Sequence, residues 1–140
     1  MRVLLDTCVL SEIRKQNGHP GVKEAVGKLK SSDLFISVIT IGEIAKGIAL
    51  LRESKRKSAL TGWLEGLEKN YASSILLIDA RTAHHWSDLT VTAQKQGKII
   101  HACDGLIAAT AKQHGLHLMT RNISDFEASG VMLINPWNDA

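Results

Sequence analysis

The sequence of 140 residues contains few cysteines, prolines and aromatic residues, and it has no long apolar run. Its two cysteines, Cys8 and Cys103, form no C-x-x-C pair, which argues against a disulfide framework and against a zinc ribbon. No apolar run approaches the length of a membrane span, and the start of the chain is too short before Asp6 for a signal peptide. We therefore expect a cytoplasmic protein with two free thiols and no membrane association.

The composition is that of an ordinary globular protein. Hydrophobic residues make up 44% and charged residues 22% of the chain, which excludes a disordered tail protein and a collagen-like fibre. A chain of this length buries most of its unfolded apolar surface without disulfides, so the sequence predicts one domain over residues 1–140. The net charge of +3 suits a polyanionic partner without requiring one.

Short apolar runs alternate with segments of helical periodicity along the whole chain. Buried strands are predicted at 3–5, 34–36, 75–78, 116–120 and 131–134, and helices at about 7–15, 20–30, 41–51, 60–67, 79–96 and 103–114, with a basic turn at 55–57. Asp79, with Thr82 in the first turn, is expected to cap one helix, and Gly115 is expected to end another. Continuously apolar strands are buried on both faces, and strands separated by helices are usually parallel. The sequence therefore predicts an α/β fold of three layers (α/β/α) with a central, mainly parallel sheet.

Three carboxylates fall near the predicted carboxyl edge of this sheet, where ligands bind in such folds. Asp6 follows the first strand, and Glu43 and Asp104 lie near the starts of two helices. Each has a structural alternative: Asp6 as a helix cap, Asp104 as a cap or a charge favoured by the helix dipole, and Glu43 as an exposed residue at the edge of an amphipathic face. Together they suit a hard divalent cation, and hence hydrolysis of a phosphodiester. Gly42 and Gly47 beside Glu43 suggest close approach of another backbone.

Four segments carry a pattern that extends over essentially the whole chain. They are Leu4-Leu5-Asp6-Thr7-Cys8-Val9-Leu10-Ser11-Glu12, Ser37-Val38-Ile39-Thr40-Ile41-Gly42-Glu43-Ile44 with Gly47-Ile48-Ala49, Asp104-Gly105-Leu106-Ile107-Ala108-Ala109-Thr110-Ala111, and Thr120-Arg121-Asn122 with Asn135-Pro136-Trp137. In this order they resemble the PIN-domain toxins of the VapC type, and the FitB-like branch most of all. The resemblance implies a single PIN domain and a metal-dependent endoribonuclease, the toxin of a bacterial type II toxin–antitoxin system. It also implies a small DNA-binding antitoxin as partner, and a homodimer that enters larger toxin–antitoxin assemblies.

The resemblance assigns roles to individual residues by position. Asp6, Glu43 and Asp104 correspond to the catalytic acids that hold Mg²⁺ or Mn²⁺, and Thr7 supplies the hydroxyl found beside the first acid. The family often has Asn where Cys8 stands, and a thiol is a poor ligand for a hard ion.

The fourth acidic position of the family is altered in this chain. It falls two residues after Thr120, where the sequence has Asn122, and the nearest acid is Asp125. An amide contributes no negative charge, so we expect one well-occupied metal position and a second that fills transiently or only with RNA phosphate present.

Basic and aromatic residues outside these segments have two interpretations each. The basic residues form either a track for an RNA backbone or solvated helix surfaces. They are Arg14, Lys15, Lys28, Lys30, Arg52 and residues 55–57. Trp63, Trp86 and Trp137 do not alternate with basic residues as a stacking platform does, which favours roles as core or interface anchors. The histidines lack a known zinc-ligand spacing.

Two other function classes compete with the nuclease. An α/β phosphatase or phosphoacceptor needs a second Asp at Cys8, or an acidic pair at Asp6 with a Lys where Asn135 and Pro136 stand, so it is the weaker rival. A catalytically weak PIN-like module that binds RNA or a partner protein stays open because of Asn122.

Overall fold

The computed structural model describes residues 1–138, so residues 139–140 of the predicted domain lie outside the described part. The strands are β1 (Val3–Leu5), β2 (Leu34–Ser37), β3 (Ile75–Leu76), β4 (His117–Met119) and β5 (Leu133–Ile134). The helices are α1 (Thr7–Arg14), α2 (Pro20–Gly27), α3 (Val38–Ala49), α4 (Lys55–Asn70), α5 (Ala80–Lys95), α6 (Ala102–His114) and α7 (Ile123–Phe126). Short 3-10 turns occur at Ser31–Asp33, Ala72–Ser74 and Glu127–Ser129. No helix within residues 1–138 is both long and apolar enough to cross a membrane.

The strands form one sheet in the order β3-β2-β1-β4-β5, and each neighbouring pair is parallel. The predicted, mainly parallel sheet is thus parallel throughout the described residues. The chain moves outward from β1 to β2 and β3, then crosses to β4 and β5 on the other side. The order therefore reverses between β1 and β4, and a ligand crevice is expected beyond the carboxyl ends of these two strands.

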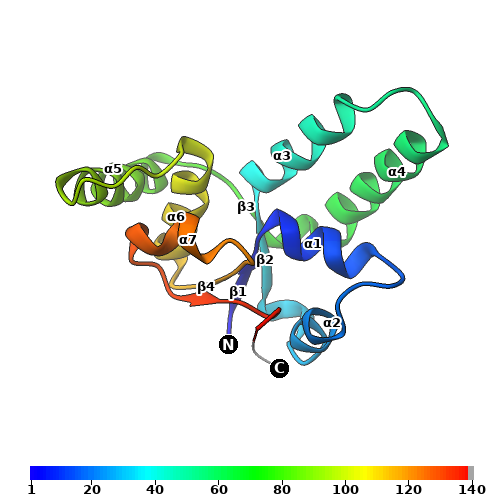
Figure 1. Ribbon diagram of the computed structural model, residues 1–140, viewed down its shortest axis with the longest axis horizontal. Helices are drawn as coiled ribbons and strands as arrows, with labels where there is room; N and C mark the ends of the chain where they lie inside the picture. Colours follow the sequence, from blue (N-terminus) through cyan, green and yellow to red (C-terminus); the bar gives the residue numbers. More distant parts are fainter. Residues whose placement is uncertain (139–140) are drawn as a thin grey trace.

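Helices cover both faces of the sheet, which confirms the predicted three layers (Figure 1). Successive side chains of a strand point to opposite faces, so Val3 and Leu5 enter one core and Leu4 enters the other. The first core contains buried residues of α1, α2, α3 and α4, and the second contains buried residues of α5, α6 and α7. In Figure 1 the two sets of helices lie on either side of the central strands.

Local capping signals set several helix boundaries. The Asp79 carboxylate and the Thr82 hydroxyl form the predicted cap at the start of α5, and Gly115, with φ of 64°, ends α6 as predicted. The prediction of a basic turn at 55–57 is wrong. The Ser54 hydroxyl accepts a 3.1 Å hydrogen bond from the backbone N–H of Lys57, so these basic residues form the first turn of α4.

The outer strands are shorter than predicted, and α7 was not predicted. β3 ends at Leu76 rather than residue 78, because it lies at the edge of the sheet and Leu77 is 67% exposed. β5 begins at Leu133 rather than residue 131. α7 contains four residues, too few for helical periodicity to be recognised.

Candidate active site

Asp6 lies directly after β1 and is 6% exposed. Its Oδ1 accepts a 2.9 Å hydrogen bond from the backbone N–H of Thr7, which confirms its predicted role as the cap of α1. Its Oδ2 accepts a 2.7 Å hydrogen bond from the hydroxyl of Thr120, directly after β4. Donors from two strand ends therefore hold this buried carboxylate in one orientation between β1 and β4.

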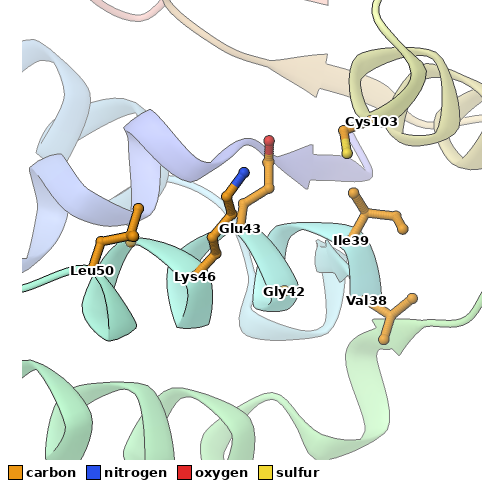
Figure 2. Close-up of a pocket in the computed structure, with 8 residues that line it drawn as sticks. Val38, Ile39, Gly42, Glu43, Lys46, Leu50 and Cys103 are labelled. Atoms are coloured by element: carbon orange, nitrogen blue, oxygen red, sulfur yellow. The ribbon is translucent and has the colours of Figure 1, made fainter.

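Glu43 is connected to Asp6 through Thr7. The hydroxyl of Thr7 donates a 3.0 Å hydrogen bond to Oε1 of Glu43, while the backbone N–H of the same threonine binds Asp6. Figure 2 shows the Glu43 side chain extending from α3 toward the junction of β1 and α1. Glu43 is half-buried, so the alternative interpretation as an exposed residue at the edge of an amphipathic face is wrong.

Asp104 occupies the first turn of α6 but does not cap it, because His101 holds the N-cap position. The predicted alternative of a capping role is therefore wrong. Burial and the charges of Asp125, Asp6 and Glu43 raise the pKa of Asp104 to about 6, while His101 acts in the opposite direction. None of these carboxylates forms an ion pair with Lys or Arg within residues 1–138. The negative charges of these acids are therefore not compensated by an ion pair with Lys or Arg within the described residues.

The segment after β4 completes the surroundings of Asp6. The buried Thr120 hydroxyl donates to Asp6 and accepts a 3.0 Å hydrogen bond from the backbone N–H of Asn122. The Asn122 residue is exposed and its side chain does not cap α7. Asp125 is exposed in the first turn of α7, and among the carboxylates its charge has the largest effect on Asp104. Asn122 thus contacts Thr120 through its backbone N–H, whereas Asp125 acts on Asp104 through its charge.

Cys8 contributes a half-buried thiol to this network. Its Sγ lies 3.7 Å from Oδ2 of Asp6 and 3.6 Å from Oγ1 of Thr120, and it accepts a 3.4 Å hydrogen bond from the backbone N–H of Arg121. Burial raises the pKa of the Cys8 thiol. Both cysteines are free, as predicted.

Sequence reasoning missed two neighbours of the acids. It treated Cys8 only as a poor metal ligand, although its spacing of two residues from Asp6 at a helix start was a signal of proximity. It considered His101 only for zinc, although this residue lies three positions before Asp104. On a helix that spacing places the two residues on the same side.

The donor set suits a hard divalent cation. Within residues 1–138, no group of three or more His, Cys, Asp or Glu side chains is placed so that it could hold a metal ion. Mg²⁺, however, usually keeps several waters and binds through one or two carboxylates together with substrate phosphates. Asp6 and Asp104 offer carboxylate oxygens, and neither forms an ion pair with a Lys or Arg side chain of the described residues. The two carboxylates therefore fit such an ion.

Two hollows flank Glu43. The first, of about 560 Å³, lies along α3 and reaches Cys103, which faces Ile39 in Figure 2. The second, of about 330 Å³, lies between α1, α3 and α4. Gly42 and Gly47 line these hollows, and a Cβ at either position would meet no atom within 4 Å. The predicted close approach of another backbone is therefore wrong, and the glycines leave the surface of α3 open.

Comparisons with known proteins identify the family. The sequence model of the PIN domain matches residues 3–128. This chain belongs to the PIN-domain family. It is 38% identical over 138 residues to "Toxin FitB" of Neisseria gonorrhoeae, which covers 98% of this chain and 99% of that protein. It is also 36% identical over 139 residues to "VapC ribonuclease Y4jK" of Sinorhizobium fredii, which covers 99% of each.

Solved structures agree with this assignment. The crystal structure of FitAcB from Neisseria gonorrhoeae matches with a TM-score of 0.90 and 38% identity, over 97% of this chain and 99% of that chain. A structure of FitAB bound to the IR36 DNA fragment matches with a TM-score of 0.91 and 36% identity, over 99% of this chain and 97% of that chain. These matches confirm the predicted PIN fold and the resemblance to the VapC and FitB proteins.

Proposed function

We propose that this PIN-domain protein is a Mg²⁺- or Mn²⁺-dependent endoribonuclease that acts as the toxin of a bacterial type II toxin–antitoxin system. The observation that carries the proposal is the convergence of Asp6, Glu43 and Asp104 beyond the ends of β1 and β4. Relatives named as a VapC ribonuclease and as the toxin FitB support the same activity and role.

Each acid has a distinct part in the proposed reaction. Asp6, fixed by Thr7 and Thr120, presents a stationary carboxylate as a metal ligand. Burial and the neighbouring acids raise the pKa of Asp104, and a nearby cation would favour its charged form, so Asp104 serves as the second ligand. Glu43 is held beside them by the hydroxyl of Thr7 and orients water or the third ligand position. A divalent cation held by Asp6 and Asp104 would supply charge neutralisation at the phosphodiester and would activate water for its hydrolysis.

The partners follow from the same proposal. A similar protein has been solved as FitAB bound to a DNA fragment, which supports a small DNA-binding antitoxin as the cognate partner of this chain. We also propose a homodimer that joins the antitoxin in a larger assembly, and a cytoplasmic location because the RNA substrate is there. A mass measurement in solution at micromolar concentration tests the dimer, and a strictly monomeric mass overturns it.

RNA cleavage with controlled metal content tests the activity. Purified protein treated with EDTA should not cut RNA, and added Mg²⁺ or Mn²⁺ should restore cleavage. Asp6→Asn and Asp104→Asn should each lower the rate by about two orders of magnitude or more, because each removes an anionic ligand. Asp88→Asn, an exposed aspartate on α5, is the matched control and should cut at the wild-type rate. Wild-type cleavage by either active-site variant would contradict the assignment.

One observation favours a second candidate function, a catalytically weak PIN-like module that binds RNA or a partner. The family's fourth acidic position is Asn122 here, and the residue is exposed without a charge of its own. The same assay separates the two functions. RNA binding without metal-restored cleavage, in protein that unfolds cooperatively on heating, would support the module and exclude the nuclease.

A further inference from the structure

We propose that the groove between α1, α3 and α4 binds the single-stranded RNA segment next to the scissile phosphate. The inference rests on the proposed function and extends it to a second region of the molecule. The groove is the hollow of about 330 Å³ between these helices. At one end its lining includes Thr7 and Glu43, which belong to the acidic centre of Asp6, Glu43 and Asp104, and elsewhere it includes Arg14, Arg56 and Trp63. The groove therefore begins beside the acidic residues and extends to a part of the surface that carries positive charge and an aromatic ring.

Helical spacing explains how three helices build this groove. On α1, Thr7, Ser11 and Arg14 are separated by four and three residues, so they share one face that leads away from the acids. On α4, Arg56 and Trp63 are seven residues apart, which places them on one face opposite α1. The floor is α3, where a glycine leaves the helix open to the groove.

The walls of the groove carry positive charge that is not paired with a carboxylate of the described residues. Arg14 and Arg56 are exposed, and neither forms an ion pair with a carboxylate of residues 1–138. By contrast, Lys15 on the same rim pairs with Glu12 at 3.4 Å. The guanidinium of Arg14 lies over the Trp63 ring, 5.7 Å from its centre, which gives this cation a defined position. Two such arginines suit the phosphates of a nucleic acid backbone.

Part of the lining of the groove is apolar and includes an aromatic ring. Ile44, Ile48, Leu60 and Trp63 line it. Trp63 packs against the core, as predicted for an anchor, but it is only half-buried and also lines the groove. Apolar side chains beside arginines suit unpaired bases joined by phosphates, because a base that displaces the Arg14 guanidinium can stack on Trp63 while the arginines contact the backbone. Paired bases of a duplex are not available for this stacking, so the groove favours a single strand.

The other hollow beside Glu43 has a different character. It contains one cation, Lys46, and is otherwise lined mainly by apolar side chains of α3 such as Val38, Ile39 and Leu50 (Figure 2). It lacks both the pair of arginines and the aromatic ring. Charge complementarity therefore assigns the RNA segment to the groove between α1, α3 and α4.

Binding measured without cleavage tests the groove. We would titrate a fluorescein-labelled, unstructured single-stranded RNA with protein in EDTA and follow its anisotropy at several salt concentrations. Arg14→Gln and Arg56→Gln should each weaken binding roughly 5-fold at about 0.1 M salt, and each should reduce the salt slope by about 0.7 as one phosphate contact is lost. Lys112→Gln removes the same charge from an exposed residue in the last turn of α6, outside the groove, and should change neither quantity.

A third variant tests the stacking separately from the charge. Trp63→Leu should weaken RNA binding roughly 10-fold without changing the salt slope, because it removes a stacking surface and no cation. Trp63→Phe should restore most of the affinity, and a thermal melt of both variants identifies any loss caused by unfolding. A duplex of the same sequence should bind more weakly than the single strand to the wild-type protein.

The outcomes separate this inference from the proposed nuclease. If the wild-type protein cleaves RNA but both arginine variants bind and cleave as Lys112→Gln does, the groove inference is wrong and the nuclease stands. If the arginine variants lose RNA affinity while the wild-type protein shows no metal-dependent cleavage, the groove stands and the nuclease is wrong. If the variants lose affinity for a purified antitoxin and keep full affinity for RNA, the groove is a protein-binding site and the inference is overturned.

Discussion

The hydroxyl of Thr120 donates a 2.7 Å hydrogen bond to Oδ2 of Asp6, across 114 residues of sequence. Both residues are buried, and the bond connects the chain after β4 to the chain after β1. The same hydroxyl accepts a hydrogen bond from the backbone N–H of Asn122. One side chain therefore orients the first metal-binding acid and also fixes the path of the segment that leads to α7.

Replacing Thr120 should disturb both functions of this hydroxyl. Thr120→Val leaves a buried carboxylate oxygen without its donor and the N–H of Asn122 without its acceptor, at a cost of about 1–3 kcal/mol in the free energy of unfolding. Affinity for Mn²⁺ should also fall because Asp6 is no longer held in place. Urea unfolding and calorimetric titration of Mn²⁺ measure the two effects. Thr120→Ser keeps the hydroxyl and should restore both, whereas unchanged Mn²⁺ affinity in Thr120→Val would exclude a positioning role.

The raised pKa of Asp104 predicts a pH-dependent stability of the metal-free protein. This carboxyl has a pKa of about 6 in the folded protein, and an unfolded Asp has one near 3.9, so the folded state binds the proton more tightly. The resulting stabilisation is fully present below about pH 4 and is lost as the pH rises through about 6. Solvent screening of this partly exposed group reduces the loss to about 1 kcal/mol.

The variant Asp104→Asn isolates this contribution. Urea midpoints measured in EDTA at about pH 4.5 and pH 7.5 should differ less in this variant than in the wild-type protein, because the amide does not titrate. Asp88→Asn on α5 serves as the control and should retain the wild-type difference. An equal pH dependence in Asp104→Asn and the wild-type protein would show that burial and the neighbouring acids do not raise the pKa of Asp104.

The charge at the fourth acidic position should set the metal requirement. Asn122→Asp adds a carboxylate at the family's acidic position, so it should lower the Mg²⁺ concentration needed for half-maximal cleavage. Asp125→Asn should have a smaller effect than Asp104→Asn, because Asp125 is exposed and Asp104 is half-buried among the acids. Unchanged metal dependence in Asn122→Asp, combined with complete loss of activity in Asp125→Asn, would identify Asp125 as the fourth acid.

The two thiols should differ in reactivity. Cys8 is half-buried against Asp6 and its pKa is raised, whereas Cys103 is exposed at the start of α6. The thiolate is the reactive species, so a disulfide reagent at pH 8 should modify Cys103 first and Cys8 much more slowly. Mass spectrometry of the Cys103→Ser variant follows Cys8 alone. Rapid modification of Cys8 in that variant would show that the thiol is accessible and ionised.

Signals within a few neighbouring residues were sufficient for much of the fold. The apolar run before Asp6 predicted β1, and the pair Asp79 and Thr82 predicted the start of α5, because strand burial and capping depend on adjacent residues. Gly115 ended α6 because its positive φ favours glycine. Local reasoning failed where the signal was ambiguous or short, as in the basic first turn of α4 and the single turn of α7.

The roles of the acidic residues were decided by contacts between distant parts of the chain. By itself, the sequence determined that Asp6 follows a buried strand and that Asp104 begins a buried helix, and in each case a cap explained the residue equally well. Only the tertiary structure showed that Asp6 is both a cap and a member of the acidic centre, while Asp104 is not a cap. The groove of Arg14, Arg56 and Trp63 likewise requires three helices to pack together. Periodicity reports which face of one helix is apolar, but the neighbour that this face meets depends on the free energy of packing the whole chain.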